Sequence, residues 1–331
     1  MDQFDYEDQN QLKVSVIANE IAINSTLSIT LQGTTRIKPG DVNRFHNYHY
    51  SLESHLAGSM TMYQLTYELA TRGIMTQREL LEIDEVDMGW IIGENIITKR
   101  NMMNGQHVNN NIPLLFSPIS LASGYLFSEE NISEITEDNL SKIIKYAKLF
   151  LENTTPEDTV SLFKTIHNTN MNLKIKDALG VTLNEKIETL LESEINLFEF
   201  LKLNKDSNSI INEIYSGYPK TIGIGLKAFY EASNQGLSIS DCISHCYLVL
   251  LASQLDEDVL LSFGKSKANE IRNLAYEIIE AGGMTSKGGR TKAADFNKYF
   301  TESGNKIIPR TSLDITAVTT YISILCGFKI K

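Results

Sequence analysis

The spacing of apolar residues is the feature that most limits what this chain can fold into. Between residues 11 and 31, apolar side chains recur three or four positions apart, as at Val14, Ile17 and Ile21. This period places them on one face of an α-helix, whereas a strand would alternate every second residue. Similar spacing returns in most segments between the glycine and proline residues. The sequence therefore predicts an all-α protein.

Glycine, proline and capping residues divide this pattern into separate helices. We expect the second helix to end near Gly73 and another to open at Thr76, where Glu79 is three residues downstream as a capping partner. The predicted helices cover residues 11–31, 52–72, 87–103, 136–152, 155–166, 186–203, 220–235, 242–253, 268–280 and 314–325, together with the one that opens at Thr76. Residues 105–125 carry a weaker pattern.

The absence of an internal repeat or a long linker predicts one multi-helix globular domain. It would cover residues 11–331, after a polar N-terminal tail over residues 1–10. The composition, 42% hydrophobic and 21% charged, is that of a folded protein. We place the candidate site between helices, near a Lys-Pro-Gly loop at residues 38–40.

The charge balance excludes some partners. Lys and Arg number 30 against 41 Asp and Glu, so the net charge is -11. Such a surface repels a nucleic-acid backbone, and a small anionic nucleotide would need a local basic pocket or a bound cation. The three cysteines form no disulfide framework, which favours a reducing compartment. No uncharged apolar run approaches the roughly 20 residues of a membrane span. We therefore expect a cytoplasmic protein with no nucleic-acid or membrane partner.

The segment most suited to chemistry is residues 36–46, RIKPGDVNRFH, between two predicted helices. Its Pro-Gly turn lets backbone amides face outward, and Lys38 and Arg44 carry charges that neutralise phosphate oxygens. Asp41 is a candidate ligand for a magnesium ion that bridges phosphates. The plainer interpretation is a surface loop whose charges are solvated.

Several motifs resemble those of one family. Residues 38–47, KPGDVNRFHN, are similar to the KPGNVxRxHD signature of the triphosphoribosyl-dephospho-CoA synthase family, especially its archaeal-type branch. Weaker matches follow in the family's order: residues 52–57 (LESHLA) resemble a YEHFLxS helix start, 217–221 (GYPKT) a GFPT turn, 258–261 (DVLL) a DTxxxR element and 308–315 (IPRTSLDI) an NPGxSADL segment.

The resemblance implies an all-α transferase that uses ATP as a ribosyl donor. The 2′-hydroxyl of 3′-dephospho-CoA would attack the ribose C1′ and displace adenine, giving 2′-(5″-triphosphoribosyl)-3′-dephospho-CoA. Carboxylates would assist an oxocarbenium-like ribose, and Mg²⁺ would hold the triphosphate. Two alternatives stay open: a diverged, non-catalytic nucleotide-binding or interaction protein, and transfer to another acceptor such as a pterin-like coenzyme. The expected partners are ATP and a dephospho-CoA-like molecule, and a homo-oligomer stays open.

The resemblance also implies roles for single residues. Asp41, Asp258 and Asp314 are the catalytic candidates, and Asp41 and Asp258 are also the candidate metal ligands. Asp314 has a plainer interpretation as a helix N-terminal charge. The substrate-binding candidates are Lys38, Gly40, Asn43, Arg44, His46, Asn109, Asn111, Lys265 and Thr311.

The chain departs from the family's pattern in three places. Residues 107–113 stand where relatives carry NTNxG or NTHxG, and Asn109 or Asn111 would supply an amide there. Residues 170–174 (NMNLK) replace a PGGLG turn. Phe263 stands where an arginine is expected, and Lys265 is near enough in sequence to replace it. Glycine lets the backbone approach a ligand closely, so its loss changes what these turns can bind.

Three other groups have both a functional and a structural interpretation. Cys242, His245 and Cys246 are spaced for one helix face and are candidate metal ligands, but cysteine is commonly a small core residue. The glycine-rich residues 282–290 are a candidate phosphate cradle, and more simply a connection between helices. His46, His49 and His55 are a further candidate metal group.

Overall fold

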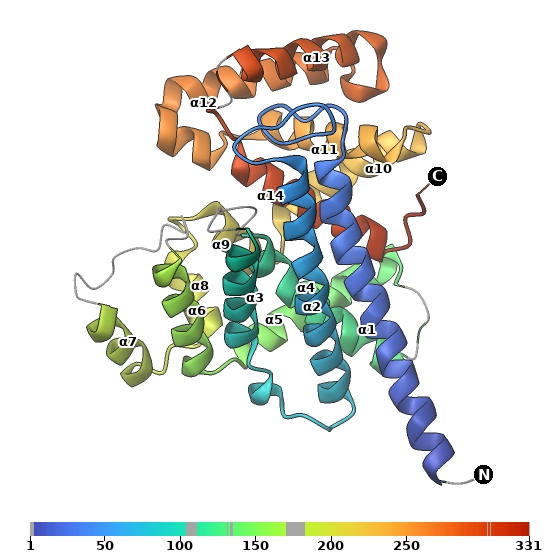
Figure 1. The fold of residues 1–331 in the computed structure, drawn as a ribbon, viewed down its shortest axis with the longest axis vertical. Coiled ribbons are helices and arrows are strands. Elements are labelled where there is room, and N and C mark those ends of the chain that lie inside the picture. Colours follow the sequence, from blue (N-terminus) through green and yellow to red (C-terminus); the bar gives the residue numbers. More distant parts are fainter. Residues whose placement is uncertain are drawn as a thin grey trace. The chain divides into compact units, whose positions relative to one another are not determined.

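The computed structural model describes residues 3–103, 111–130, 132, 135–169, 183–302, 304 and 306–330. Within these ranges the chain is helical and forms no strand, which confirms the predicted all-α class (Figure 1). The α-helices are α1 (Gln3–Gly33), α2 (Leu52–Gln77), α3 (Met88–Met102), α4 (Ile112–Glu130), α5 (Leu140–Glu152), α6 (Pro156–Asn168), α7 (Leu183–Glu192), α8 (Leu197–Asn204), α9 (Ser209–Tyr215), α10 (Lys227–Asn234), α11 (Ile239–Ser253), α12 (Glu257–Glu280), α13 (Lys287–Glu302) and α14 (Arg310–Leu325). Short 3-10 turns are η1 (Ile83–Glu85), η2 (Glu137–Asn139) and η4 (Gly283–Thr285), and η3 (Thr221–Leu226) is a π-helix.

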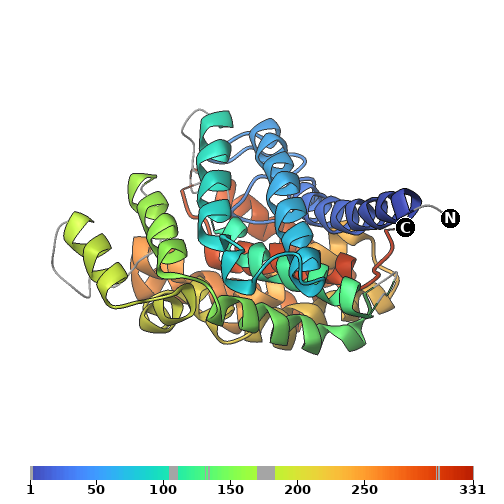
Figure 2. The same ribbon diagram turned by 90° about the horizontal axis from the view of Figure 1, so that it is seen from below.

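The chain divides into two compact units, each built from separate stretches of sequence. Unit 1 comprises Met1–Thr26, Met60–Gly217 and Leu325–Gly327. Unit 2 comprises Leu27–Ser59, Tyr218–Ile324 and Phe328–Lys331. Helices α1 and α2 are neighbours in Figure 1, and in Figure 2 the N-terminal end of α1 extends away from α2.

In unit 1, helix starts and buried faces follow from local sequence. Thr155 caps α6, and its side chain and that of Asp158 exchange hydrogen bonds with each other's backbone N–H, with Pro156 at the first helical position. This confirms the predicted start. Helix α5 buries one stripe, which includes Ile143, Ala147 and Phe150. The four-residue spacing explains why one face is apolar.

A close crossing of α2 and α4 organises unit 1. A Cβ placed on Gly73 would lie 2.1 Å from the carbonyl oxygen of Leu121, and one on Gly124 would lie 2.1 Å from that of Ala70. Glycine at both positions therefore lets the two backbones approach each other. The expectation that the second helix ends near Gly73 is wrong, because this glycine serves packing inside a helix that continues to Gln77.

In unit 2, α14 is buried on all sides from Thr311 to Ile324, although it contains many hydroxyl side chains. These hydroxyls are satisfied within the helix: Thr316 donates to the carbonyl of Ser312, and Thr320 donates to that of Thr316. Bonding to the carbonyl four residues earlier lets serine and threonine enter an apolar core. This segment was predicted as a helix, and it begins four residues earlier than expected.

Other boundaries differ from prediction for local reasons. Thr76 lies inside α2 and starts no helix. The predicted helix over residues 186–203 is two helices, α7 and α8, separated where Glu194 takes a positive φ of 50°. Helix α12 begins at Glu257, well before the expected residue 268, and has a kink at Gly264. Helix α13 was not predicted from the sequence.

Among the described residues, Val14–Gly33 in α1 has the length and hydropathy to cross a membrane. A core helix of a folded protein meets the same criteria. Within unit 1, Ala18, Ile21 and Ala22 of this segment are fully buried. Ser25 also shares a 2.6 Å hydrogen bond with Thr66 of α2.

The α2–α4 crossing makes a stability prediction. A Gly124→Ala methyl would collide with the α2 backbone, so the variant should lose about 1–3 kcal/mol of unfolding free energy. Gly223→Ala is the matched control, because a Cβ there would meet nothing within 4 Å. Urea unfolding followed by circular dichroism measures both. Equal stability of the two variants would contradict the proposed contact.

Candidate functional site

The loop between α1 and α2 is fixed to α11 by its own backbone carbonyls and amides. Ser244 Oγ donates to the carbonyl of Ile37 at 2.6 Å, and the Tyr247 hydroxyl donates to that of Pro39 at 2.6 Å. The N–H of Arg36 donates to Ser240 Oγ at 3.0 Å. These bonds satisfy main-chain groups that a tight turn would leave unpaired. These hydrogen bonds therefore fix the Lys-Pro-Gly segment in place within unit 2.

Inside this loop, Lys38 and Asp41 form a buried ion pair. The Lys38 Nζ lies 2.8 Å from Asp41 Oδ2, and the two residues are only 0% and 3% exposed. The Tyr50 hydroxyl donates to Asp41 Oδ1 at 2.8 Å, so both carboxylate oxygens are engaged. Burial alone would raise the pKa of Asp41, but Lys38, His55 and the Tyr50 hydrogen bond together hold it below its usual value. Asp41 is thus ionised, and its charge is matched within the protein.

Asn43 shapes the end of the loop. Its side-chain Oδ1 accepts from the N–H groups of Phe45 and His46, at 3.0 and 3.2 Å, and its side chain is buried. This Asx-type turn directs Arg44 and His46 to the surface, where both are exposed. Of the predicted phosphate-binding residues in the loop, Arg44 and His46 are therefore accessible, whereas Lys38 and Asn43 are not.

A second segment of the site is the start of α12. Asp256 caps this helix, since one carboxylate oxygen accepts from the N–H of Val259 at 3.3 Å. The other oxygen accepts from both the N–H and the hydroxyl of Ser312 in α14, each at 2.8 Å. Burial raises the pKa of Asp256 to about 7, although these donors oppose the rise. One carboxylate thus joins the first turns of two helices.

Asp258 lies beside this junction and is only partly buried. Its Oδ2 accepts from the Thr311 hydroxyl at 3.2 Å, and the Thr311 N–H also donates to the carboxylate. Burial raises the pKa of Asp258, while the nearby Arg310 guanidinium and Thr311 act in the opposite direction. The two acidic residues therefore differ: Asp256 is enclosed, and Asp258 keeps access to a ligand.

The loop, the start of α12 and the start of α14 meet in unit 2. Gly40 has a φ of 86°, and a Cβ there would lie 2.5 Å from Cδ of Pro309, just before α14. The charges of Asp41, Arg310 and Asp314 all act on the pKa of Tyr50, which burial raises well above its usual value. Tyr50 therefore stays protonated as a donor at the centre of this cluster.

The remaining predicted site residues lie in different places. Asp314 is buried on α14, one turn after Arg310. Lys265 is exposed and follows the kink at Gly264. Asn111 directly precedes α4 in unit 1, and Asn109 lies outside the described residues, as do residues 170–174.

Residues important to this geometry were missed in the sequence. Asp256 carries a recognisable signal, because an aspartate directly before an apolar-periodic run is a common helix cap. Ser312 and Arg310 stand in a matched segment, yet their roles depend on Asp256 and Asp258, which are distant in sequence. Tyr50 and Tyr247 have no local signal, since each acts on a loop that only the folded chain brings near.

The other candidate groups have structural roles. Cys242 and Cys246 are fully buried, and no three His, Cys, Asp or Glu side chains among the described residues are grouped to hold a metal ion. Residues 282–290 connect α12 to α13, and their Met284 N–H donates to His245 Nδ1. This supports the helix-connection interpretation.

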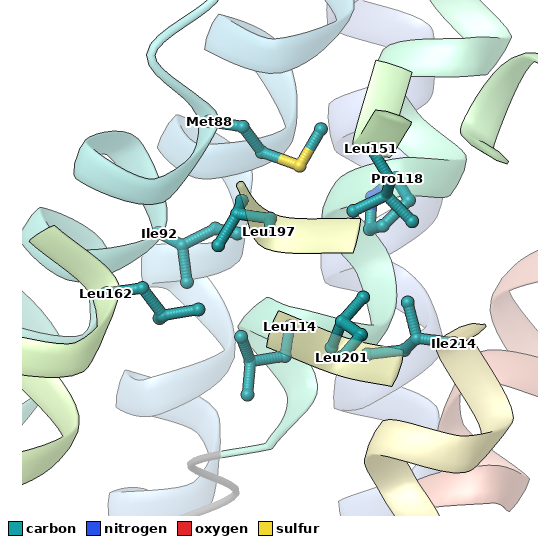
Figure 3. Close-up of a pocket in the computed structure, with 9 residues that line it drawn as sticks. All are labelled: Met88, Ile92, Leu114, Pro118, Leu151, Leu162, Leu197, Leu201 and Ile214. Atoms are coloured by element: carbon teal, nitrogen blue, oxygen red, sulfur yellow. The ribbon is translucent and has the colours of Figure 1, made fainter. Parts of the chain in front are cut away.

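One gap between side chains of unit 1 is too small and too apolar to be a nucleotide site. Its free volume is about 20 Å³, near that of one water-sized sphere, whereas ligand pockets usually reach hundreds of Å³. Figure 3 shows the side chains that surround it, all apolar: Met88, Ile92, Leu114, Pro118, Leu151, Leu162, Leu197, Leu201 and Ile214. The gap is a feature of core packing.

The Lys38–Asp41 pair predicts a stability effect. Asp41→Asn leaves the Lys38 charge buried without its partner, so we expect a loss of about 3–5 kcal/mol in unfolding free energy. Adding Lys38→Met to this variant removes the unpaired charge and should restore part of the loss. Chemical denaturation of the single and double variants measures this. A double variant less stable than Asp41→Asn would contradict the pairing.

The raised pKa of Asp256 predicts a pH effect. An aspartate whose folded-state pKa is about 7, against about 3.9 when unfolded, stabilises the fold fully below about pH 4. That contribution is lost as the pH rises towards 7. The stability of the wild type relative to Asp256→Asn should therefore fall between pH 4 and 7, as followed by urea denaturation. The exposed Asp295→Asn variant should instead run parallel to the wild type, and parallel curves for Asp256→Asn would contradict the assignment.

Among solved structures, a protein of Archaeoglobus fulgidus described as a candidate triphosphoribosyl-dephospho-CoA synthase has a TM-score of 0.53 and 18% sequence identity. The match covers 80% of this chain and 99% of that chain, and at this identity it shows a shared fold. No curated protein matches the chain. A sequence model described as ATP:dephospho-CoA triphosphoribosyl transferase matches residues 18–330, almost the whole chain. The chain therefore belongs to the ATP:dephospho-CoA triphosphoribosyl transferase family.

Proposed function

We propose that this protein transfers the triphosphoribosyl group of ATP to the 2′-hydroxyl of a 3′-dephospho-CoA-like acceptor and releases adenine. The observation that carries this proposal is the family match over residues 18–330. It is supported by the meeting, within unit 2, of the loop containing Lys38 with the starts of α12 and α14. These three segments bring carboxylates and a guanidinium together, and of these groups Asp258 and Arg310 are partly exposed, as a transfer between anionic substrates requires.

The chemistry resembles glycoside cleavage. The bond between the adenine nitrogen and the ribose C1′ breaks, and the acceptor oxygen forms a new bond to C1′ through an oxocarbenium-like transition state. We place Asp258 as the group that takes the proton from the acceptor hydroxyl, and adenine takes up a proton as it leaves. Two properties support this role: Asp258 is partly accessible, and burial raises its pKa towards that of an effective base.

Magnesium would neutralise the triphosphate charge when bound. Asp41 is poorly suited to hold it, because Lys38 and Tyr50 already engage both carboxylate oxygens. Asp258 suits it better, since its carboxylate is partly exposed, whereas that of Asp41 is buried. Few protein ligands are needed, because magnesium commonly keeps several waters beside substrate phosphates.

The cytoplasm is the proposed location. It is supported by the three free cysteines of the described chain, two of them buried.

The test measures ATP binding by calorimetry, with and without magnesium, and then adenine release with dephospho-CoA by chromatography. We expect ATP to bind and adenine to appear. In Asp258→Asn, adenine release should fall about 10²- to 10⁴-fold. Asp295→Asn is the matched control, because Asp295 is an exposed aspartate of α13 in the same unit, and it should keep wild-type activity.

The outcomes separate the alternatives. Wild-type turnover of Asp258→Asn would exclude Asp258 as the base. Loss of magnesium-dependent ATP binding in that variant would make Asp258 a metal ligand. ATP binding without adenine release, with dephospho-CoA and other CoA-like acceptors, would contradict the transferase and support a non-catalytic nucleotide-binding protein.

A further inference from the structure

Arg310 is the first residue of α14 and holds a half-buried guanidinium within the site. It is close enough to Asp258 and to Tyr50 to oppose the rise that burial causes in the pKa of each. However, no ion pair or hydrogen bond of its guanidinium is seen with any residue in the described part of the chain. A guanidinium has five N–H donors, and burying it without acceptors is unfavourable. Its position is therefore one that a bound anion would satisfy.

The backbone N–H groups at the start of α14 are already used by the protein. The first N–H groups of α14 donate internally: that of Thr311 to Asp258, that of Ser312 to Asp256 and that of Leu313 to the Pro309 carbonyl. The helix start therefore binds the protein's own carboxylates. A substrate anion must be held by a side chain that projects from it.

The nearby lysines do not supply that side chain in this structure. Lys38 is enclosed in its ion pair with Asp41. Lys267 bonds to Glu270 and to the Tyr299 hydroxyl. Lys265 was predicted to replace the arginine expected at Phe263. It is exposed beyond the α12 kink, and no contact among the described residues places its ammonium beside Asp258. Arg310 is the cation that does act on Asp258.

A positive charge at the first position of a helix is also unfavourable, because the helix dipole is positive there. Asp256 and Asp258 offset this field at the start of α14, and Arg310 acts on the charge of Asp258 without an ion pair that is seen among the described residues. Phosphate oxygens match the planar fork of arginine and can accept two parallel hydrogen bonds. The positive charge of Arg310 and the N–H donors of its guanidinium both indicate a ligand that carries phosphate groups.

We propose that Arg310 binds the polyphosphate of the nucleotide substrate. This inference rests on the proposed function, because it takes ATP as the donor. It places the triphosphate beside Asp258, so the ribose C1′ and the base that receives the acceptor proton share one region. Arg310 would thus set specificity for a triphosphate over an uncharged nucleoside.

The experiment measures binding of ATP, inorganic tripolyphosphate and adenosine to the full chain by calorimetry. Arg310→Gln should weaken ATP and tripolyphosphate binding about 10- to 100-fold, the usual effect of losing charged hydrogen bonds. Adenosine binding should be unchanged. Arg310→Lys should give intermediate affinities, because it keeps the charge and loses the fork. Thermal unfolding of each variant confirms that it is folded.

Arg272→Gln is the matched control, since Arg272 is a half-buried arginine of α12 in the same unit. It should bind all three ligands as the wild type does. Equal ATP and tripolyphosphate affinity in Arg310→Gln and wild type would overturn the inference and leave the proposed function standing. Loss of binding in Lys265→Gln instead would assign the role to Lys265. A wild type that binds neither ATP nor tripolyphosphate would overturn both.

Discussion

The carboxylate of Asp256 is the contact on which the candidate site depends. It accepts hydrogen bonds from the first turn of its own helix and from Ser312 of α14, two segments far apart in sequence. A side chain with a single acceptor oxygen, such as asparagine, could cap α12, but it would have no second oxygen to accept the hydrogen bonds of Ser312 in α14. The direction of Asp258 and the position of Arg310 follow from this junction.

In the loop around Lys38, several residues of a recognisable motif stabilise the fold and are not available to bind a ligand. Its lysine and aspartate satisfy each other inside the protein, and its carbonyls accept hydrogen bonds from α11. Charged groups are costly to bury singly, so an internal pair is the usual solution when a turn is enclosed. What remains for a ligand is the exposed end of the loop, at Arg44 and His46.

The fold could be predicted largely because helices have recognisable local sequence patterns. Apolar spacing indicated most elements, and Thr155 with Pro156 marked the start of α6. Gly73 misled the prediction, since a glycine that permits close helix packing and one that ends a helix look alike in sequence. The site was harder, because the partners of Asp41, Asp256 and Arg310 are set by contacts across the chain. The motif matches indicated these segments as candidates, and they could not predict that Lys38 is enclosed while Arg310 has no ion pair or hydrogen bond of its guanidinium among the described residues.

The divided sequence of unit 2 has a consequence for synthesis. The loop containing Lys38 belongs to Leu27–Ser59, while Asp256 and α14 belong to Tyr218–Ile324, so all of Met60–Gly217 is translated between them. On the ribosome, the earlier stretch must wait for its packing partners, and closing so long a connection slows folding. Until α14 emerges, the apolar surfaces that it covers in unit 2 stay exposed, and the loop has no Pro309 to pack against. Unit 2 therefore stays incomplete until α14 has been synthesised.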